Sequence, residues 1–287
     1  MSLVCTEKNF TVFGRTIAAR FWPNPQGRPL LALHGWLDNA ATFDLLAPLL
    51  EGYQTCAIDF AGHGRSDHLP PGVPYSWFLQ MNDAFAVADQ LGWAQFTLLG
   101  HSMGAHLGLY MAAAFPERID RLVLIDAIGH PGLKSERIVA ETRQALERLH
   151  GLENRTPPLY ENFEAMLLPR MKTVGNITEA AARTLLDRGV MPCNGGLTWS
   201  SDSRLRYPDP ARLTEEEVQA FIQAVEAPTL LILGEQGWPW SADFIARRTA
   251  VHRNLQKLIL PGGHHLHLED SAPEVAQAIL DFLGRAA

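Results

Sequence analysis

Leu98-Leu99-Gly100-His101-Ser102-Met103-Gly104 is the stretch that decides how the rest of this sequence is interpreted. A short apolar run, residues 96–99, leads into Gly-x-Ser-x-Gly, and residues 105–115 then predict a helix. This strand–turn–helix context is what a nucleophile elbow requires. Because the turn is tight, glycine is expected at both 100 and 104. The Ser102 hydroxyl is expected to stand above the end of the sheet.

The composition is that of a folded protein with a substantial core. The chain has 287 residues, of which 47% are hydrophobic and 19% charged, with a net charge of −7. Dispersed basic residues argue against nucleic acid as a partner. The three cysteines, Cys5, Cys56 and Cys193, have no disulfide or zinc spacing, which suits a reducing compartment. With no signal-peptide core and no long apolar run, we expect a cytoplasmic protein without a membrane span.

Strands and helices alternate along the first part of the chain. Residues 10–13 and 15–22 flank Gly14 and predict a hairpin. Four further runs predict strands: 30–33, 54–59, 96–99 and 122–125. Helices are expected at 42–50 and 76–91. The alternation predicts an α/β fold with a mostly parallel, doubly wound sheet. His34, Ser102 and Asp126 all come at carboxyl ends of strands, where reactive groups gather in such sheets.

The rhythm changes between residues 130 and 225. Helical patterns are expected at 134–150, 160–171, 178–188 and 214–225, with no buried strand between them. We interpret 130–225 as a helical cap inserted after the sixth strand. The core domain would then comprise 1–129 and 226–287, with strands at 229–233 and 256–260 and a closing helix at 273–282.

Four motifs carry a resemblance to a known family. They are His34-Gly35, Asp59-x-x-Gly62-His63-Gly64-x-Ser66, the Ser102 elbow, and Gly263-His264 followed by Glu269. In this order and spacing the sequence resembles the α/β-hydrolase superfamily over nearly its whole length. The stretches 32–39, 71–75 and 185–189 look closer still to its serine hydrolase-like proteins. The resemblance implies a serine-nucleophile hydrolase with a helical cap, but it supplies no substrate.

A serine nucleophile needs a base, and His264 is the best candidate among eleven histidines. It follows a predicted strand, and the superfamily order of serine, acid and histidine places the base late in the chain. His265 and His267 are rivals on the same loop. The family's usual five-residue step from histidine to glutamate points from Glu269 to His264. A metal pair is disfavoured because no further ligands have suitable spacing.

The acid departs from the common family pattern. Many relatives carry an aspartate in a Gly-Glu-x-Asp loop, but here that position is Gly237. A carboxylate is still needed to orient the imidazole and stabilise the imidazolium. Asp126 is the natural replacement, since haloalkane dehalogenases place their acid at the end of the same strand. Glu235, a residue of the cap, or a dyad without acid are the alternatives.

The tetrahedral intermediate requires preorganised N–H donors. We expect these to be the backbone N–H groups of Met103 and Trp36. The residues expected to line the pocket are Trp36, Met103, Phe43, Trp199 and Trp238, which suggests a hydrophobic acyl or aryl group. No phosphate-binding glycine loop follows a first strand, so we expect neither a nucleotide nor any other cofactor.

The favoured interpretation is a cofactor-free, carboxylesterase-like hydrolase that cleaves an ester or related acyl bond through an acyl-Ser102 intermediate. A C–C bond hydrolase of a diketone-type substrate would use the same triad. A non-catalytic hydrolase scaffold that binds a ligand is the alternative from another class. A small molecule is the expected partner, and the sequence leaves a homodimer open.

Overall fold

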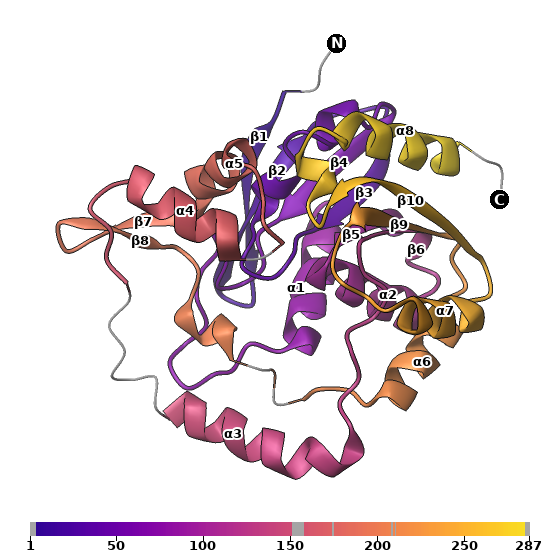
Figure 1. The fold of residues 1–287 in the computed structure, drawn as a ribbon. Coiled ribbons are helices and arrows are strands. Elements are labelled where there is room, and N and C mark those ends of the chain that lie inside the picture. The colour runs from indigo at the N-terminus through magenta and orange to yellow at the C-terminus, as the bar shows by residue number, and fades with distance from the viewer. Residues whose placement is uncertain (1–3, 151–157, 174, 208, 210, 285–287) are drawn as a thin grey trace.

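The computed structural model describes residues 4–150, 158–173, 175–207, 209 and 211–284, and an eight-stranded sheet forms its centre. The strands lie in the order β1-β2-β4-β3-β5-β6-β9-β10 (Figure 1). Their bounds are Thr6–Val12 (β1), Arg15–Trp22 (β2), Arg28–Leu33 (β3), Tyr53–Ile58 (β4), Phe96–His101 (β5), Ile119–Ile125 (β6), Thr229–Gln236 (β9) and Leu255–Gly263 (β10). Strand β2 is antiparallel to β1 and β4, and all other pairs are parallel. The predicted mostly parallel sheet is confirmed.

The sheet is covered on both faces because successive side chains point to opposite sides of each strand. In β3, Leu31 and Leu33 join one buried cluster, whereas Leu30 and Ala32 join another. The first cluster includes side chains of α1 (Trp77–Gln90) and α2 (Met103–Ala114), and the second includes those of α8 (Ala272–Leu283). The architecture is therefore doubly wound, as expected.

Two further helices pack on the first face of the core. They are α6 (Glu215–Ala224) and α7 (Ala242–Val251), and the sequence analysis did not predict α7. Val218 and Ile222 of α6 belong to the same buried cluster as α2. The last predicted helix of the 130–225 segment thus packs on the core, so the boundary of the cap at 225 remains a proposal.

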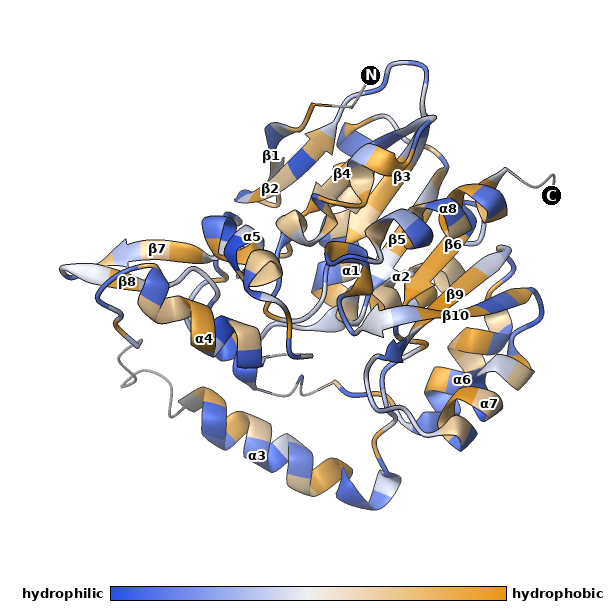
Figure 2. Ribbon diagram, turned by 45° about the horizontal axis from the view of Figure 1, so that its top comes forward, coloured by the Kyte–Doolittle hydropathy of each residue, from blue (hydrophilic) through white to orange (hydrophobic). Residues whose placement is uncertain are grey.

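Within its described residues, the rest of the segment predicted as a cap adds no strand to the central sheet, and its α3 (Ile138–His150) lies away from the strands (Figure 1). It also contains α4 (Glu164–Thr173), α5 (Glu179–Gly189), β7 (Val190–Cys193) and β8 (Gly196–Trp199). The hairpin of β7 and β8 was not predicted. Side chains of α4 and α5 form a third buried cluster, which also includes Ile177 and Leu268. Figure 2 shows that α3 carries alternating hydrophobic and hydrophilic residues.

One predicted helix is wrong in type. Residues 42–50 form two short 3₁₀ turns, Ala40–Phe43 and Ala47–Leu49, instead of one amphipathic α-helix. Pro48 explains the difference, because proline has no N–H to continue a helical ladder.

Within the described residues, no helix combines the length and apolarity needed to cross a membrane.

Candidate active site

Ser102 occupies the sharp turn between β5 and α2. Its backbone has φ 51° and ψ −113°, in the left-handed region that few non-glycine residues adopt. A Cβ atom at Gly104 would lie 2.0 Å from the carbonyl oxygen of Leu33, and one at Gly100 would lie 2.4 Å from that of Gly104. Both glycines are therefore required by close backbone approach. The predicted elbow geometry is present.

His264 and Asp126 form a buried pair at the same edge of the sheet. Nδ1 of His264 lies 2.6 Å from Oδ2 of Asp126, and the two side chains are 2% and 1% exposed. Asp126 directly follows β6, and His264 directly follows β10. A carboxylate only accepts, so Nδ1 carries the proton and Nε2 presents a lone pair. Within the described residues Nε2 has no hydrogen-bond partner, which leaves it available as a base.

Backbone donors from the end of β9 and from the loop after it fix the Asp126 carboxylate. The N–H of Gly234 donates to Oδ1 at 3.1 Å, and that of Trp238 donates to Oδ2 at 2.6 Å. Glu235, the alternative acid, is exposed at the end of β9 and makes no contact with His264 in the described structure. The geometry thus favours Asp126 over Glu235.

The two expected oxyanion donors lie beside one cavity. Trp36 and Met103 both line it, together with Ser102. Their backbone N–H groups have no acceptor among the described residues. Met103 is the first residue of α2, where N–H groups lack an intrahelical acceptor. Both N–H groups therefore remain candidates for the two oxyanion donors.

The cavity has a volume of about 480 Å³, and its lining corrects two pocket predictions. Trp238 does line it, with its ring 5.2 Å from that of His264. Phe43 does not, because it is fully buried in the cluster beneath α8. Trp199 does not either, because it packs on Tyr160 in the cluster of α4 and α5. Single aromatic residues carried no signal that distinguishes a core from a pocket.

Several lining residues were missed by the sequence analysis. His106, Leu107 and Tyr110 lie on α2, and Trp77, Leu213 and Trp240 come from other elements. The positions 102, 106 and 110 are four residues apart and share one face of a helix. Helical spacing counted from Ser102 could therefore have found His106 and Tyr110. Burial lowers the pKa of His106 well below its ordinary value, with a smaller contribution from nearby positive charge, so the ring is neutral.

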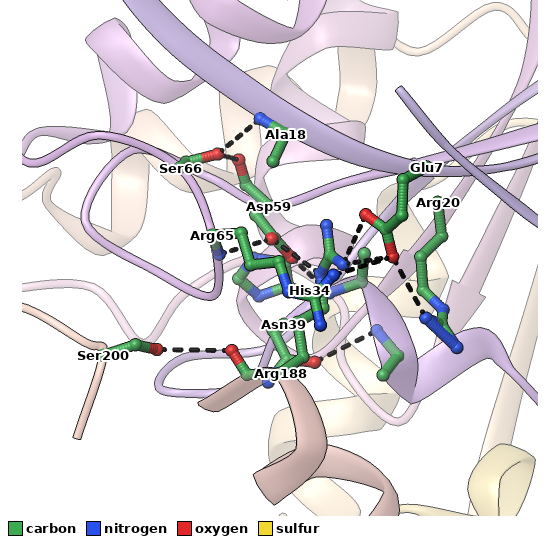
Figure 3. A network of polar contacts seen from close by, with 12 residues as sticks. Glu7, Ala18, Arg20, His34, Asn39, Asp59, Arg65, Ser66, Arg188 and Ser200 are labelled. Atoms are coloured by element: carbon green, nitrogen blue, oxygen red, sulfur yellow. Dashed lines mark hydrogen bonds and ion pairs between the residues drawn. The ribbon is translucent and has the colours of Figure 1, made fainter. Parts of the chain in front are cut away.

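The carboxylate of Asp59 is held in a buried hydrogen-bonded loop. Figure 3 shows this carboxylate, which accepts from the backbone N–H of Ala40 and of Arg65 and from Nε of Arg188. His34 Nε2 accepts from Phe60 N–H, so its Nδ1 donates to the carbonyl of Gly35. His34 is thus an organiser of the loop, not a base.

Asp38, His101 and His265 are the described residues that could together hold a metal ion. Their ligand atoms all lie within 4.8 Å of one another, and all three side chains are buried. However, the guanidinium of Arg170 is hydrogen-bonded to the same Asp38 carboxylate. A cation there would face that positive charge at short range, so we assign no metal to this cluster.

Comparison with known proteins identifies the family. Residues 28–271 match the family model of the alpha/beta hydrolase fold, and the chain belongs to this family. It is 33% identical to a serine hydrolase-like protein of Dictyostelium discoideum, over 94% of this chain and 79% of that protein.

Two solved structures are similar over almost their whole length. A hypothetical protein from Pseudomonas aeruginosa PAO1 has a TM-score of 0.93 and 40% identity, covering 97% of this chain and 99% of that one. A thioesterase domain from the curacin biosynthetic pathway has a TM-score of 0.85 and 25% identity, covering 96% and 99%. The fold and superfamily expected from the sequence motifs are confirmed, and the chain is a hydrolase.

Proposed function

We propose that this hydrolase cleaves a carboxylic ester or related acyl bond of a small, largely hydrophobic substrate through an acyl-Ser102 intermediate. The observation that carries the proposal is the buried Asp126–His264 pair, whose Nε2 lone pair is unpartnered among the described residues. A serine hydroxyl becomes a useful nucleophile only beside such a base. The strained position of Ser102 above the sheet supports the same role.

In the acylation step, Ser102 Oγ bonds to the acyl carbon while His264 Nε2 takes the hydroxyl proton. The carbonyl oxygen becomes an anion, for which the N–H groups of Trp36 and Met103 are the donors. Asp126 stabilises the imidazolium without becoming protonated. When the tetrahedral intermediate collapses, the bond to the leaving alcohol breaks, and His264 returns the proton to its oxygen.

Deacylation repeats these steps with water as the nucleophile. His264 removes a proton from the water, hydroxide adds to the acyl carbon, and the proton passes to Ser102 Oγ as the carboxylic acid leaves. No cofactor is needed for either half of the reaction.

The substrate class is inferred from the cavity. Its apolar wall includes Trp36, Leu107, Leu205, Trp238 and Trp240. Such a wall favours burial of an acyl chain or an aryl group. The similarity to a thioesterase domain supports an acyl bond as the target.

The test is hydrolysis of p-nitrophenyl esters of increasing acyl length, together with labelling by a fluorophosphonate. We expect labelling of the wild type and a loss of at least about a thousandfold in kcat for Ser102→Ala. The dependence of the hydrolysis rate on acyl length measures the size of the pocket. A wild type that is inert on every ester and unlabelled would refute the proposal in favour of a ligand-binding scaffold.

A further inference from the structure

A buried ion pair joins the inserted segment to the core beside the proposed catalytic loop. Arg170 of α4 donates from its guanidinium to Oδ1 of Asp38, and the two side chains are 5% and 1% exposed. Burial alone would raise the pKa of Asp38, but the charges of His265 and Arg170, together with the hydrogen bond from His265, hold it well below its ordinary value. Asp38 is therefore a buried anion whose charge Arg170 balances.

Asp38 in turn holds the loop that carries His264. Its Oδ2 atom accepts from Nε2 of His265 at 2.9 Å. On the other side of the same peptide, Nε2 of His101 donates to the carbonyl oxygen of His264 at 2.9 Å. The ring of His101 is packed between Asp38 and His264, with Nδ1 3.5 Å from Oδ2 of Asp38. Two hydrogen bonds thus hold the peptide between residues 264 and 265, one at the carbonyl oxygen of His264 and one at the side chain of His265.

The segment that follows Arg170 also covers this loop. A Cβ atom at Gly175 would lie 2.7 Å from Cβ of His264, so the two residues are in close contact. Further along, the N–H of Thr178 donates to Oε1 of Glu269 at 2.7 Å. Gly175 and Thr178 therefore both contact the segment of residues 264–269.

We propose that Arg170 is a positioning residue for His264. By holding Asp38, it fixes His265 and hence the orientation of the neighbouring imidazole. The rate of Ser102 acylation then depends on how α4 sits on the core. This inference rests on the proposed function of Ser102. Its test must therefore distinguish failure of the inference from failure of the proposed function.

Arg188 provides a matched control, because it is a second buried arginine of the inserted segment. Its Nε lies 2.7 Å from Oδ2 of Asp59, and the two side chains are 1% and 0% exposed (Figure 3). It also pairs with Glu7. None of these described partners belongs to the loop of residues 263–269. Arg170→Met and Arg188→Met therefore each remove a buried arginine–aspartate ion pair, and only the first of these pairs is connected to His264.

The first readout is the rate constant for labelling of Ser102 by a fluorophosphonate, with kcat and KM for a p-nitrophenyl ester. For Arg170→Met we expect labelling and kcat to fall about ten- to a hundredfold with KM unchanged, because small misplacements of a catalytic group have effects of this size. Arg170→Lys should recover most of the rate. Arg188→Met should unfold more easily than the wild type but label at the wild-type rate.

A second pair of variants tests the connection from Arg170 to His264 at the hydrogen bond between His265 and Asp38. His265→Leu cannot donate to Asp38, whereas His265→Gln places an amide N–H near the position of Nε2. We expect the slow labelling of Arg170→Met in the leucine variant and recovery in the glutamine variant. This pair tests the inference even if Arg170→Met does not fold.

Equal labelling rates in Arg170→Met and Arg188→Met would overturn the inference, as would an effect confined to KM. A stoichiometric transition metal that is lost in Asp38→Asn would overturn it too, since the cluster would then be a metal site. If the wild type is never labelled, the proposed function fails separately. The low-field proton resonance of the His264–Asp126 hydrogen bond then decides: it should be lost in Arg170→Met and kept in Arg188→Met, and its persistence in both overturns the inference.

Discussion

Asp126 and Gly237 compete for one small volume beside His264. A Cβ atom at Gly237 would lie 2.3 Å from Oδ1 and 2.6 Å from Oδ2 of Asp126. Many relatives in the superfamily carry their acid at the position of Gly237. In this chain the carboxylate that we propose as the acid lies at the end of β6 instead. Glycine is therefore required at position 237, because a larger side chain would overlap the Asp126 carboxylate in its present position.

We predict that Gly237→Ala inactivates the enzyme although Gly237 contacts no substrate. The added methyl group would displace the Asp126 carboxylate from His264 Nδ1, so kcat should fall about a hundredfold or more. The kcat of Asp126→Asn should fall further, because the amide cannot stabilise the imidazolium. Ester hydrolysis measures both variants.

Glu235→Gln is the control for this pair, because Glu235 is exposed on the same loop. Its activity should equal that of the wild type. A fully active Gly237→Ala would contradict the assignment of Asp126. The double variant Asp126→Gly/Gly237→Asp should regain part of the lost activity, since it supplies a carboxylate to the same volume.

At the scale of elements, a buried ion-pair network attaches α5 to the sheet. Arg188 of α5 bonds to Asp59 after β4 and to both carboxylate oxygens of Glu7 in β1 (Figure 3). Glu7 has its pKa lowered: partial burial acts to raise it, but the hydrogen bonds and charge of Arg188 outweigh that effect. Three segments far apart in the sequence thus depend on one guanidinium.

We predict that Arg188→Met lowers the free energy of unfolding by about 3–5 kcal/mol, because it leaves the Asp59 carboxylate buried without its charge partner. The methionine keeps most of the side-chain volume, so loss of packing contributes little. Urea unfolding measures the change.

Asp59→Asn and the double variant complete the cycle. The double variant should cost less than the sum of the single changes, by about 2 kcal/mol or more. Strict additivity would mean that the pair contributes no coupling, which would contradict the attachment inferred for α5.

Local sequence patterns predicted the elements of the core better than those of the insertion. Strands β3 and β6 both end in continuous buried apolar runs, at residues 30–33 and 122–125, and α1 follows its capping serine, Ser76. The hairpin of β7 and β8 has only four residues in each strand and is mostly half-buried, so its sequence is too short to show an apolar alternation. Helix α6 shows the expected period, but periodicity alone could not tell that it packs on α2.

At the scale of the whole molecule, burial keeps several histidines neutral. It lowers the pKa of His63 and of His101 to about 3 each, and nearby charges change these values less. The pKa of His267 is also lowered well below its ordinary value, mainly by burial. The unfolded chain would bind protons at these positions near pH 6.5. The folded protein binds them only in strong acid.

We predict that the folded state loses stability as the pH falls below about 6.5. Above that pH the histidines are neutral in both states, and their contribution to stability is fully present. Between about 6.5 and 3 only the unfolded state is protonated, so each such histidine should remove about 1.4 kcal/mol per pH unit. Burial raises the pKa of Asp44 to about 6, although Arg20 opposes this shift. Protonation of Asp44 in the folded state therefore partly offsets the loss of stability that one histidine causes as the pH falls.

Urea unfolding at pH 7.5, 6.0 and 5.0, values chosen to span about this range, tests the prediction. His63→Gln removes one titrating group. The slope of the free energy of unfolding against pH should therefore decrease by about the contribution of one proton. A free energy of unfolding that stays constant over this interval would contradict it.

By itself the sequence determined the sheet, the elbow at Ser102 and the candidacy of His264, because these depend on local patterns: apolar strands, obligatory glycines and chain order. The contact of Asp126 with His264, the lining of the cavity and the contact of Arg170 with Asp38 were decided only by the tertiary structure. Asp126 meets His264 across 138 residues, and Arg170 meets Asp38 across 132. Such contacts arise from how strands and helices pack, and no local pattern encodes them.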